Sequence, residues 1–275
     1  MFSHFSSIYY STIQKLKTAI ILLRCMNYVR GALSSQDLRE LIKTGTFGEE
    51  YTPDVENRIQ PASYDPLFED YCFRVPHGFK PVIGTTVEEA LRKLPKNDVQ
   101  RYDISKGFEV KPGFSYLLPL RGTFHLPEGK WLKSSPKSTQ GRLANFLRLV
   151  ADGTPEYDEV WGPFQGKLYA LLEPRVFHVI IHPTTPLLQL RIYQGTTTPY
   201  LTTEELCREV TKHNLIIHEG TPLDITKTKL LYGVPLTVDL KGDYTNGIVG
   251  YKARHTPNPI DLTKPRSYDI EEYFD

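Results

Sequence analysis

The chain has 275 residues, with 33 Lys and Arg against 32 Asp and Glu and a formal net charge of +1. This balance argues against a protein that coats a nucleic acid polymer electrostatically. Hydrophobic residues form 40% of the sequence and charged residues 24%, which excludes wholesale disorder and allows a sizeable core in one or two domains. The 17 Tyr, 13 Phe and 21 Pro favour strands joined by loops.

The N-terminal segment differs from the rest of the chain. Residues 1–36 contain no Asp or Glu but include Lys15, Lys17, Arg24 and Arg30. The apolar run Thr18–Leu23 is too short to cross a bilayer, which needs about 20 residues. Residues 1–25 are either an organelle-targeting segment or an extension ahead of a true start at Met26. In both cases we expect residues 1–30 to lie outside the fold and residues 31–275 to form one domain.

Helix signals occur at a few places along the body of the chain. Ser34 and Ser35 precede a short helix that continues to Ile42 and ends near Gly45. Thr86-Val-Glu-Glu89 is a capping box that opens a helix ending at Pro95. Two further helices are expected, over Leu143–Ala151 and Thr202–His213.

Short apolar and aromatic runs follow at short intervals along the remaining sequence. Most are rich in β-branched or aromatic residues and are bounded by Gly, Pro or Asp. They are Phe114–Leu120, Lys167–Leu172, Val176–Ile181, Leu187–Tyr193, Val234–Leu240 and Ile248–Tyr251. This pattern predicts a mainly β domain, a sandwich or barrel with a few short helices.

Several site classes lack their sequence signatures. Cys25, Cys72 and Cys207 have no metal-binding spacing, and the absence of an N-glycosylation sequon favours a cytoplasmic location. His178 and His182 would share a strand face, but with no nearby cysteine or carboxylate trio we expect no metal there. The P-loop, dinucleotide-binding and zinc-deaminase motifs are also missing.

The densest polar segment is Ser134-Ser-Pro-Lys-Ser-Thr-Gln-Gly-Arg142, ahead of the expected helix at Leu143. Hydroxyls, two cations and free backbone N–H groups at a helix start suit phosphate oxygens. The alternative is a helix-capping loop with incidental charges.

Three other polar residues are candidate substrate contacts. Asp158 and Glu159 could hold a ribose hydroxyl or position a water, or they form a solvated turn. Gln189 lies among apolar strand residues, where its amide either finds ordinary partners or reads a base or a phosphate.

The ordered motifs resemble a known family. Gln60-Pro-Ala-Ser-Tyr-Asp65 resembles a signature of 2′-deoxycytidine 5′-triphosphate (dCTP) deaminases in the trimeric dUTPase superfamily, and Pro136–Arg142 is similar to its second motif. The resemblance is greatest to the long, alphaproteobacterial-type form and covers about residues 30–275. Its other segments are Gly162–Ala170, Pro186–Arg191, Val234–Leu240 and Gly250–Arg254.

The resemblance implies a distorted β-barrel or β-clip fold, a homotrimer with active sites between subunits, and no membrane or nucleic acid polymer as partner. It also implies a nucleoside triphosphate substrate (dCTP or dUTP) with Mg²⁺ bound through the triphosphate, and no zinc. By position, Lys137, Ser138 and Thr139 would contact substrate, and Gln189 the triphosphate. Ser138 and Arg142 would also help to orient the attacking water and the amino group.

The catalytic carboxylate is the main departure from the family pattern. The family has a Glu five residues after the glycine that is Gly166 here, whereas this chain has Leu171, and leucine cannot transfer protons. Glu173 lies two residues on, and thus on the same face of a strand. We therefore expect Glu173 to join Ser138 and Arg142 in catalysis. The long forms also carry a similar second domain after the segment that ends here at Asp275.

Three functions follow. The first is hydrolytic deamination of dCTP to dUTP and ammonia, which supplies pyrimidine deoxynucleotides. The second is dUTP pyrophosphatase activity, for which Asp158 is the nearest candidate acid. The third is a catalytically silent nucleotide-binding or assembly module, which the leucine at position 171 favours.

Overall fold

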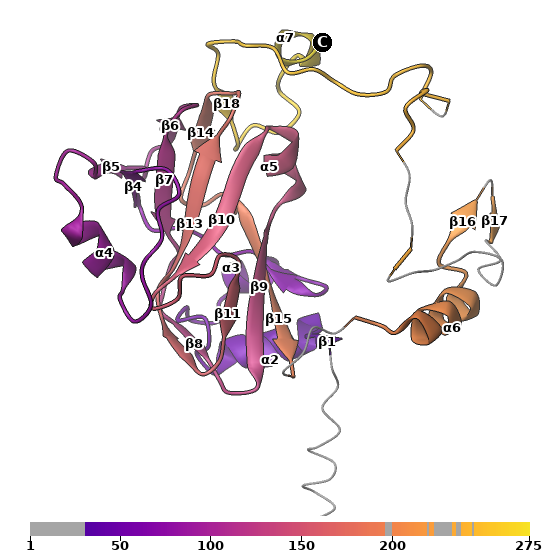
Figure 1. Cartoon of the computed structure of the whole chain (residues 1–275), viewed down its shortest axis with the longest axis horizontal. Helices are drawn as coiled ribbons and strands as arrows, with labels where there is room; N and C mark the ends of the chain where they lie inside the picture. The colour runs from indigo at the N-terminus through magenta and orange to yellow at the C-terminus, as the bar shows by residue number, and fades with distance from the viewer. Residues whose placement is uncertain (1–30, 196–199, 219, 223–232, 235–237, 244) are drawn as a thin grey trace, which may run out of the picture.

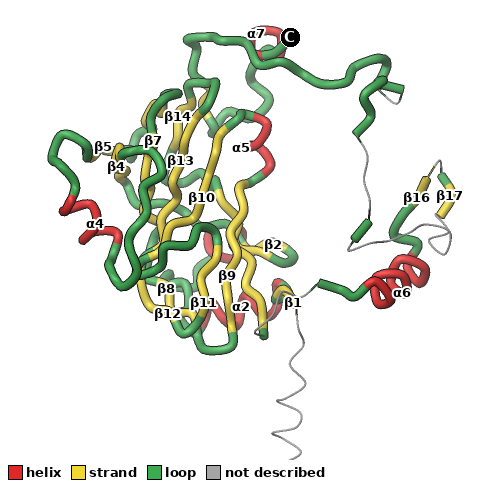
Figure 2. Tube along the Cα trace, in the orientation of Figure 1, coloured by secondary structure: helices red, strands yellow, loops and turns green. Residues whose placement is uncertain are grey.

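The computed structural model describes residues 31–195, 200–218, 220–222, 233–234, 238–243 and 245–275. The expected N-terminal extension, residues 1–30, lies outside the described residues, and so do residues 235–237 of the strand expected over Val234–Leu240; the described residues of that run are not in a strand. Figures 1 and 2 show a body of packed strands, with α6 (Thr203–His213) and the hairpin β16–β17 standing apart from it.

One large sheet has the strand order β11-β9-β15-β3-β2, with β1 also pairing to β15. Its members are β1 (Gly31–Ala32), β2 (Ile59–Gln60), β3 (Ser63–Tyr64), β9 (Lys130–Pro136), β11 (Glu159–Trp161) and β15 (Leu188–Gln194). β9 and β15 are antiparallel, with Ser134 opposite Leu190. Alternate residues of β15, such as Leu190 and Ile192, are fully buried, which is the period-2 pattern of a sheet with one face on the core.

The second large sheet has the order β10-β13-β7-β4-β5. It contains β4 (Tyr71–Val75), β5 (Gln100–Asp103), β7 (Ser115–Pro119), β10 (Asn145–Ala151) and β13 (Leu168–Pro174). Along β13, Ala170 and Leu172 pack into the main core, whereas Leu171 packs in a separate cluster on the opposite face. This sheet therefore has two packed faces.

Smaller sheets complete the body. β6 (Phe108–Val110), β14 (Val179–Ile181) and β18 (Ile260–Asp261) form one; β8 (Phe124–Leu126) pairs with β12 (Phe164–Gly166), and β16 (Ile217–His218) with β17 (Thr221–Pro222). The main core takes side chains from both large sheets, for example Leu132 and Leu149. The prediction of a mainly β fold with a few short helices is confirmed.

The short helices lie around the sheets. They are α2 (Ser35–Lys43), α3 (Pro53–Asn57), α4 (Val87–Lys93), α5 (Ser138–Arg142), α6 and α7 (Ile270–Tyr273). The expected caps are present: Ser34, Thr86 and Thr202 each form a capping box. No helix within the described ranges combines the length and apolar character that crossing a membrane requires.

The helix expected over Leu143–Ala151 is wrong. Helix α5 instead lies within the Lys137–Arg142 segment, and it ends before Ala144, whose φ of 53° is left-handed. Residues Asn145–Ala151 then form strand β10, because Leu147 and Leu149 face the core while Phe146 and Arg148 are exposed. This alternation has the period of a strand and not of a helix.

The strand expected over Ile248–Tyr251 is also wrong. Within the described part of the chain this segment pairs with no strand, and Ile248, Val249 and Tyr251 are exposed. Residues that favour strands do not form one when no neighbouring strand accepts and donates the backbone hydrogen bonds. The chain regains contact with the body at β18, and Phe274 packs against Phe177.

Candidate active site

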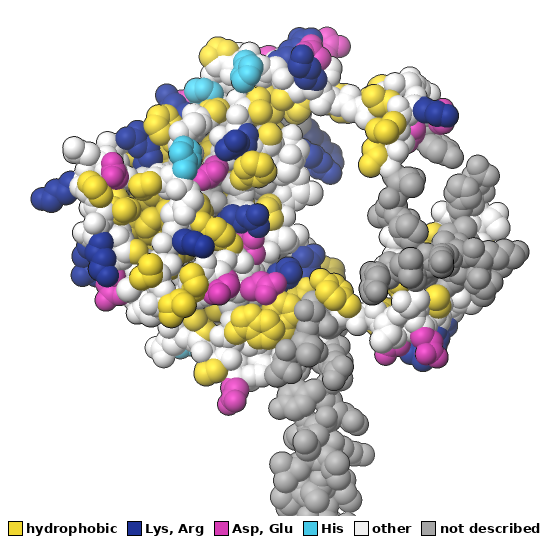
Figure 3. Space-filling view, in the orientation of Figure 1, with side chains coloured by type: hydrophobic (Ala, Val, Ile, Leu, Met, Phe, Trp, Pro, Cys, Tyr) yellow, Lys and Arg dark blue, Asp and Glu magenta, His cyan; other side chains and the backbone are white. Residues whose placement is uncertain are grey.

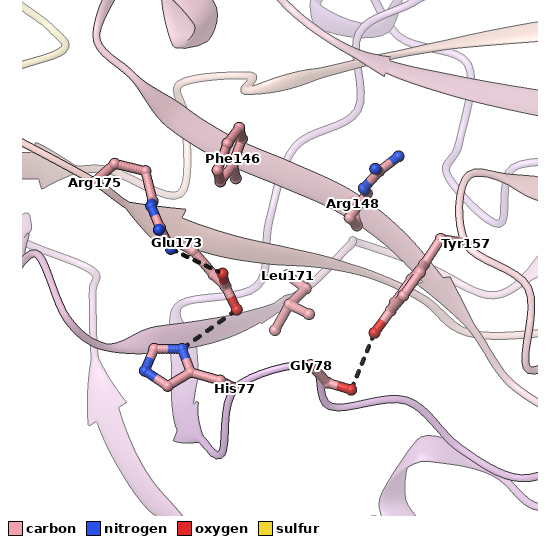
Figure 4. A pocket seen from close by; sticks show the side chains of 8 residues that line it. All are labelled: His77, Gly78, Phe146, Arg148, Tyr157, Leu171, Glu173 and Arg175. Carbon is pink, nitrogen blue, oxygen red and sulfur yellow. Dashed lines mark hydrogen bonds and ion pairs between the residues drawn. The ribbon is translucent and has the colours of Figure 1, made fainter.

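A cavity of about 410 Å³ opens on the outer face of the second sheet. This volume is within the range of about 300–1,000 Å³ that is typical of small-molecule sites. Figure 4 shows the residues that line it: His77, Gly78, Phe146, Arg148, Tyr157, Leu171, Glu173 and Arg175. Hydrophobic, basic and acidic side chains alternate over this side of the molecule, as the space-filling view in Figure 3 shows.

Two paired strands form the floor of the cavity. In the antiparallel register of β10 and β13, Phe146 lies opposite Glu173, and Arg148 lies opposite Leu171. Directly opposed residues project to the same face of a sheet, so these four side chains share the cavity side. Leu171 is 3% exposed and closes the apolar end of the floor, where it packs in the cluster covered by helix α4.

Glu173 is the carboxylate of this cavity. The hydroxyl of Ser115 donates to its Oε1 at 2.6 Å, and His77 Nδ1 lies 3.5 Å from the same oxygen. Arg175 Nη1 lies 3.9 Å from the other oxygen, Oε2. Figure 4 shows Glu173 directed toward His77 and Arg175.

These contacts set the protonation of Glu173. Burial raises the pKa of this carboxyl, but hydrogen bonds from Ser115, His77 and the Gly78 backbone outweigh burial and hold the pKa below its usual value. Glu173 is therefore a carboxylate at neutral pH. In that form it can accept a proton from a water molecule inside the cavity.

Aromatic and basic side chains surround the remaining space. The Arg175 guanidinium lies 5.2 Å from the centre of the Phe146 ring, and Arg148 donates to Asp158 at 2.5 Å. The Tyr157 hydroxyl donates to the backbone oxygen of Gly78 at 3.1 Å. The cavity thus offers flat apolar surfaces beside one carboxylate, an arrangement that suits a planar polar ring.

The Lys137–Arg142 segment directly precedes strand β10, which carries two of the lining residues, but the segment itself does not line the cavity. Ser138, Thr139 and Arg142 are exposed, and none of the three is among the lining residues. Their side chains make no hydrogen bond or ion pair within the described residues. The structure therefore leaves the three groups available to a ligand or a neighbouring subunit, and it does not bring Ser138 and Arg142 together with Glu173 in one cavity.

Lys137 anchors this segment to the Gln60–Asp65 motif. Its ammonium forms an ion pair with the Oδ2 oxygen of Asp65, whose side chain is 4% exposed. The Oδ1 oxygen of Asp65 is buried with no hydrogen-bond partner in the described part of the protein. Removal of Lys137 would leave a buried carboxylate without its counter-charge.

A buried polar network fixes the first motif. The Arg58 guanidinium donates to the Asp65 backbone oxygen at 3.3 Å and to Glu49 at 3.0 Å, and it also contacts the Tyr64 hydroxyl. Tyr64 in turn donates to Glu49, and burial together with this carboxylate raises the Tyr64 pKa above its usual value. Because each partner is satisfied by another, the network holds Asp65 under Lys137.

The other predicted substrate contacts lie outside the cavity. Asp158 accepts from Arg148 and, at 2.8 Å, from the Leu149 backbone N–H. Glu159 pairs with Lys133 at 2.9 Å on the outer face of the first sheet, where Gln189 is half-buried opposite Ser135. Asp158, Glu159 and Gln189 are not lining residues of the cavity.

The paired histidines have carboxylate partners. His178 Nδ1 lies 2.6 Å from Glu109, and His182 Nε2 lies 3.1 Å from Asp261. Among the residues that the structure describes, no three His, Cys, Asp or Glu side chains gather in a group that could hold a metal ion.

Sequence reasoning identified Glu173 and Leu171 but missed the residues around them. His77 follows strand β4, Ser115 begins β7 and Arg175 follows β13, so no local motif joins them. One sequence signal points to part of this site: apolar and other residues alternate over Asn145–Ala151, as in a strand. A strand there, paired with β13, places Phe146 and Arg148 beside Glu173.

The comparisons with known proteins agree with the sequence motifs. The family model described as the 2′-deoxycytidine 5′-triphosphate deaminase N-terminal domain matches residues 29–196, and the corresponding C-terminal domain model matches residues 203–275. A search of curated proteins found no match.

A solved structure is similar over most of the chain. The crystal structure of 2′-deoxycytidine 5′-triphosphate deaminase from Agrobacterium tumefaciens matches with a TM-score of 0.79 and 28% sequence identity, covering 90% of this chain and 68% of that one. Since the N-terminal family model alone spans more than half of the sequence, the chain belongs to the 2′-deoxycytidine 5′-triphosphate deaminase family.

Proposed function

We propose that this protein is a hydrolytic deaminase that converts dCTP to dUTP and ammonia in pyrimidine deoxynucleotide metabolism. The observation that carries the proposal is the carboxylate of Glu173 in a cavity with aromatic and apolar walls. The membership of the chain in the dCTP deaminase family supports the same reaction.

In this proposal the cytosine ring enters the cavity beside Phe146 and Tyr157, with its amino group toward Glu173. The carboxylate takes a proton from the attacking water, the water oxygen bonds to C4, and the proton passes to the departing amino group. The tetrahedral carbon then expels ammonia, the second water proton ends on the ring nitrogen N3, and the oxygen remains as the carbonyl of uracil. Glu173 thus takes the acid–base role for which Leu171 has no suitable group.

The triphosphate would bind at the neighbouring segment. Ser138, Thr139 and Arg142 present hydroxyls and a cation to solvent, and Lys137 is held at the base of the segment by Asp65. Hydroxyl and guanidinium groups of this kind bind phosphate oxygens. The backbone from Arg142 to Phe146 spans at most about 14 Å, so one extended nucleotide can reach both places.

Further features of the proposal concern the assembly and the metal. We expect Mg²⁺ to arrive bound to the substrate triphosphate, no zinc to be required, and the enzyme to act in the cytoplasm. A homotrimer would place a second subunit near the exposed Ser138 and Arg142 side chains, so that the neighbour completes the contacts to the attacking water and the amino group.

The structure bears differently on the two alternative functions. Leu171 at the family's Glu position favours a silent nucleotide-binding module. The dUTP pyrophosphatase alternative loses support because its acid, Asp158, is occupied by Arg148 and a backbone N–H.

Product analysis distinguishes the three functions. Purified protein is incubated with dCTP and Mg²⁺, and separately with dUTP and Mg²⁺. Formation of dUTP and ammonia from dCTP is the expected result. Pyrophosphate release from dUTP would establish the second function instead, and nucleotide binding with no product in either reaction would establish the silent module.

A further inference from the structure

Ser115 bridges two titratable groups at the edge of the cavity. Its Oγ lies 2.7 Å from His77 Nδ1 and 2.6 Å from Glu173 Oε1. Ser115 is 1% exposed, so no bulk water competes for either contact. Both distances are those of strong hydrogen bonds, and each contact therefore contains a proton.

A count of protons shows that the three groups share a mobile one. His77 Nε2 lies 3.1 Å from the backbone oxygen of Gly113, and a carbonyl oxygen only accepts, so Nε2 carries its own proton. The single hydroxyl proton of Ser115 fills one of its two contacts. The other contact needs a second proton, which resides on His77 Nδ1 or on Glu173 Oε1.

We propose that His77 and Ser115 are positioning residues that form a proton relay between Glu173 and solvent. The inference rests on the proposed function only in assigning the relay to deamination. In one arrangement His77 is an imidazolium and Glu173 a carboxylate; in the other, His77 is neutral and Glu173 is a carboxylic acid.

The transfer between the two arrangements is balanced and needs no co-reactant. The Nδ1–H bond of His77 breaks as a new O–H bond forms at Ser115 Oγ, and the former hydroxyl proton moves to Glu173 Oε1. The reverse steps return the proton to His77. Only protons move, and the nitrogen and oxygen atoms keep their positions, so the transfer needs no rearrangement of the site.

The remaining groups around Glu173 favour its carboxylate form. Arg175 approaches from the residue after β13, and the Gly78 backbone N–H contributes a hydrogen bond, whereas Arg148 on β10 lines the same cavity but pairs with Asp158. Tyr157 also faces the carboxylate, which raises the pKa of the tyrosine hydroxyl in addition to burial. The resting arrangement of the relay is therefore the one in which Glu173 is a carboxylate.

Exposure connects the relay to solvent. The side chain of His77 is 61% exposed, whereas that of Glu173 is 20% exposed. In the proposed deamination Glu173 takes a proton from water and later gives it to the amino group, so Glu173 holds a proton in the middle of each cycle and the relay can exchange that proton with bulk water. His77 gives that carboxylate an exit to bulk water through Ser115.

The direct test follows the titration of Glu173 itself, by ¹³C NMR of labelled glutamate side chains. We expect the Glu173 pKa to rise in Ser115→Ala and in His77→Ala, and to stay near the wild-type value in Ser115→Thr, which keeps a hydroxyl. The exposed His125 provides a matched control, since His125→Ala should leave the titration unchanged. The shift of the Glu173 pKa that His77→Ala causes should be less than half as large in the Ser115→Ala background as in the wild type.

A second arm measures turnover of dCTP. His77→Ala should lower kcat roughly 10- to 100-fold with KM nearly unchanged, within the contribution of general acid–base groups. Added imidazole should restore turnover in His77→Ala but not in the double variant with Ser115→Ala. A structural role for His77 would not produce rescue that depends on Ser115.

The outcomes separate the relay from the proposed function. If Glu173 titrates identically in the wild type, Ser115→Ala and His77→Ala, the relay is wrong, whatever the activity. If the titration depends on Ser115 and His77 but no dUTP forms, the relay stands and the deaminase proposal fails. If turnover is present but His77→Ala matches the wild type, the relay is not part of the reaction.

Discussion

The cavity around Glu173 and the Lys137–Arg142 segment differ in how completely their groups are satisfied within the chain. In the cavity, Glu173 has Ser115 and His77 as close partners. In the segment, Lys137 pairs with the buried Asp65 and the buried Gln140 accepts from Asn145 at 3.0 Å, while the Ser138, Thr139 and Arg142 side chains are exposed. The proposed acid–base group is therefore positioned by its own subunit, whereas the proposed phosphate-binding side chains have no partner among the described residues.

Because of this difference, we expect substitutions in the two regions to change different quantities: the reaction rate, the nucleotide affinity or the stability of the fold. Substitutions in the cavity should change the chemical step, because preorganised groups act on the reacting atoms. Substitutions of the exposed segment should change nucleotide affinity, and substitution of its buried anchor should change stability. The predictions below test that separation.

The largest effect is expected at Glu173. Glu173→Gln keeps the size of the side chain but cannot accept a proton, so kcat for dCTP should fall about 10²- to 10⁴-fold. Steady-state kinetics measure the loss, and Glu128→Gln, at an exposed position, is the control. A Glu173→Gln protein as active as the wild type would remove Glu173 from the reaction.

The next effect concerns the anchor of the exposed segment. Lys137→Ala leaves the buried Asp65 carboxylate unpaired and should lower the free energy of unfolding by about 3 kcal/mol. Urea titration measures the change. Lys133→Ala removes a partly exposed pair with Glu159 and should cost about 1 kcal/mol or less, so equal losses in the two variants would contradict the anchor role.

Arg142 should affect binding and not folding. Because its side chain is exposed, Arg142→Ala should leave stability unchanged but weaken dCTP binding roughly 10- to 100-fold, the value of a charge-assisted phosphate contact. Calorimetric titration with dCTP measures the affinity. Arg92→Ala, on the surface of helix α4, is the matched control, and unchanged affinity in Arg142→Ala would place the triphosphate elsewhere.

Asp158 should behave as a structural residue. The φ of 68° at this position is tolerated by Asn, so Asp158→Asn isolates the loss of charge opposite Arg148. The expected loss of stability is about 1 kcal/mol, with dCTP affinity unchanged. A large fall in nucleotide affinity would restore Asp158 as a substrate contact.

The smallest effect is the pH dependence of stability at Glu173. Its folded pKa lies below the ordinary value of 4.5, so its contribution is present above that value and is lost as the pH falls through the folded pKa. The difference in unfolding free energy between wild type and Glu173→Gln should therefore shrink below pH 4.5. A difference that grows on acidification would reverse the assigned direction.

The strand content and the capped helices were predictable because their signals are local. Thr86 and Glu89 form their capping box within four residues of sequence, and the β-rich runs that form β7, β13 and β15 have the composition of strands. The helix predicted over Leu143–Ala151 failed because the polar segment before it forms helix α5 itself, whereas buried Leu147 and Leu149 alternate with exposed residues as in a strand.

The site was predictable only in part, for a physical reason. Glu173 could be found because it shares a strand face with Leu171. His77 and Ser115 reach the same carboxylate through the pairing of β4, β7 and β13, which is fixed by tertiary packing and leaves no spacing in the sequence.

The central claim is that the cavity beside Glu173 receives the cytosine ring of dCTP. Intermolecular nuclear Overhauser effects between the cytosine H5 and H6 protons and labelled aromatic rings test this directly. The account predicts contacts from both protons to Phe146 and Tyr157. Bound dCTP whose H5 and H6 protons contact other residues, and neither of these rings, would contradict it.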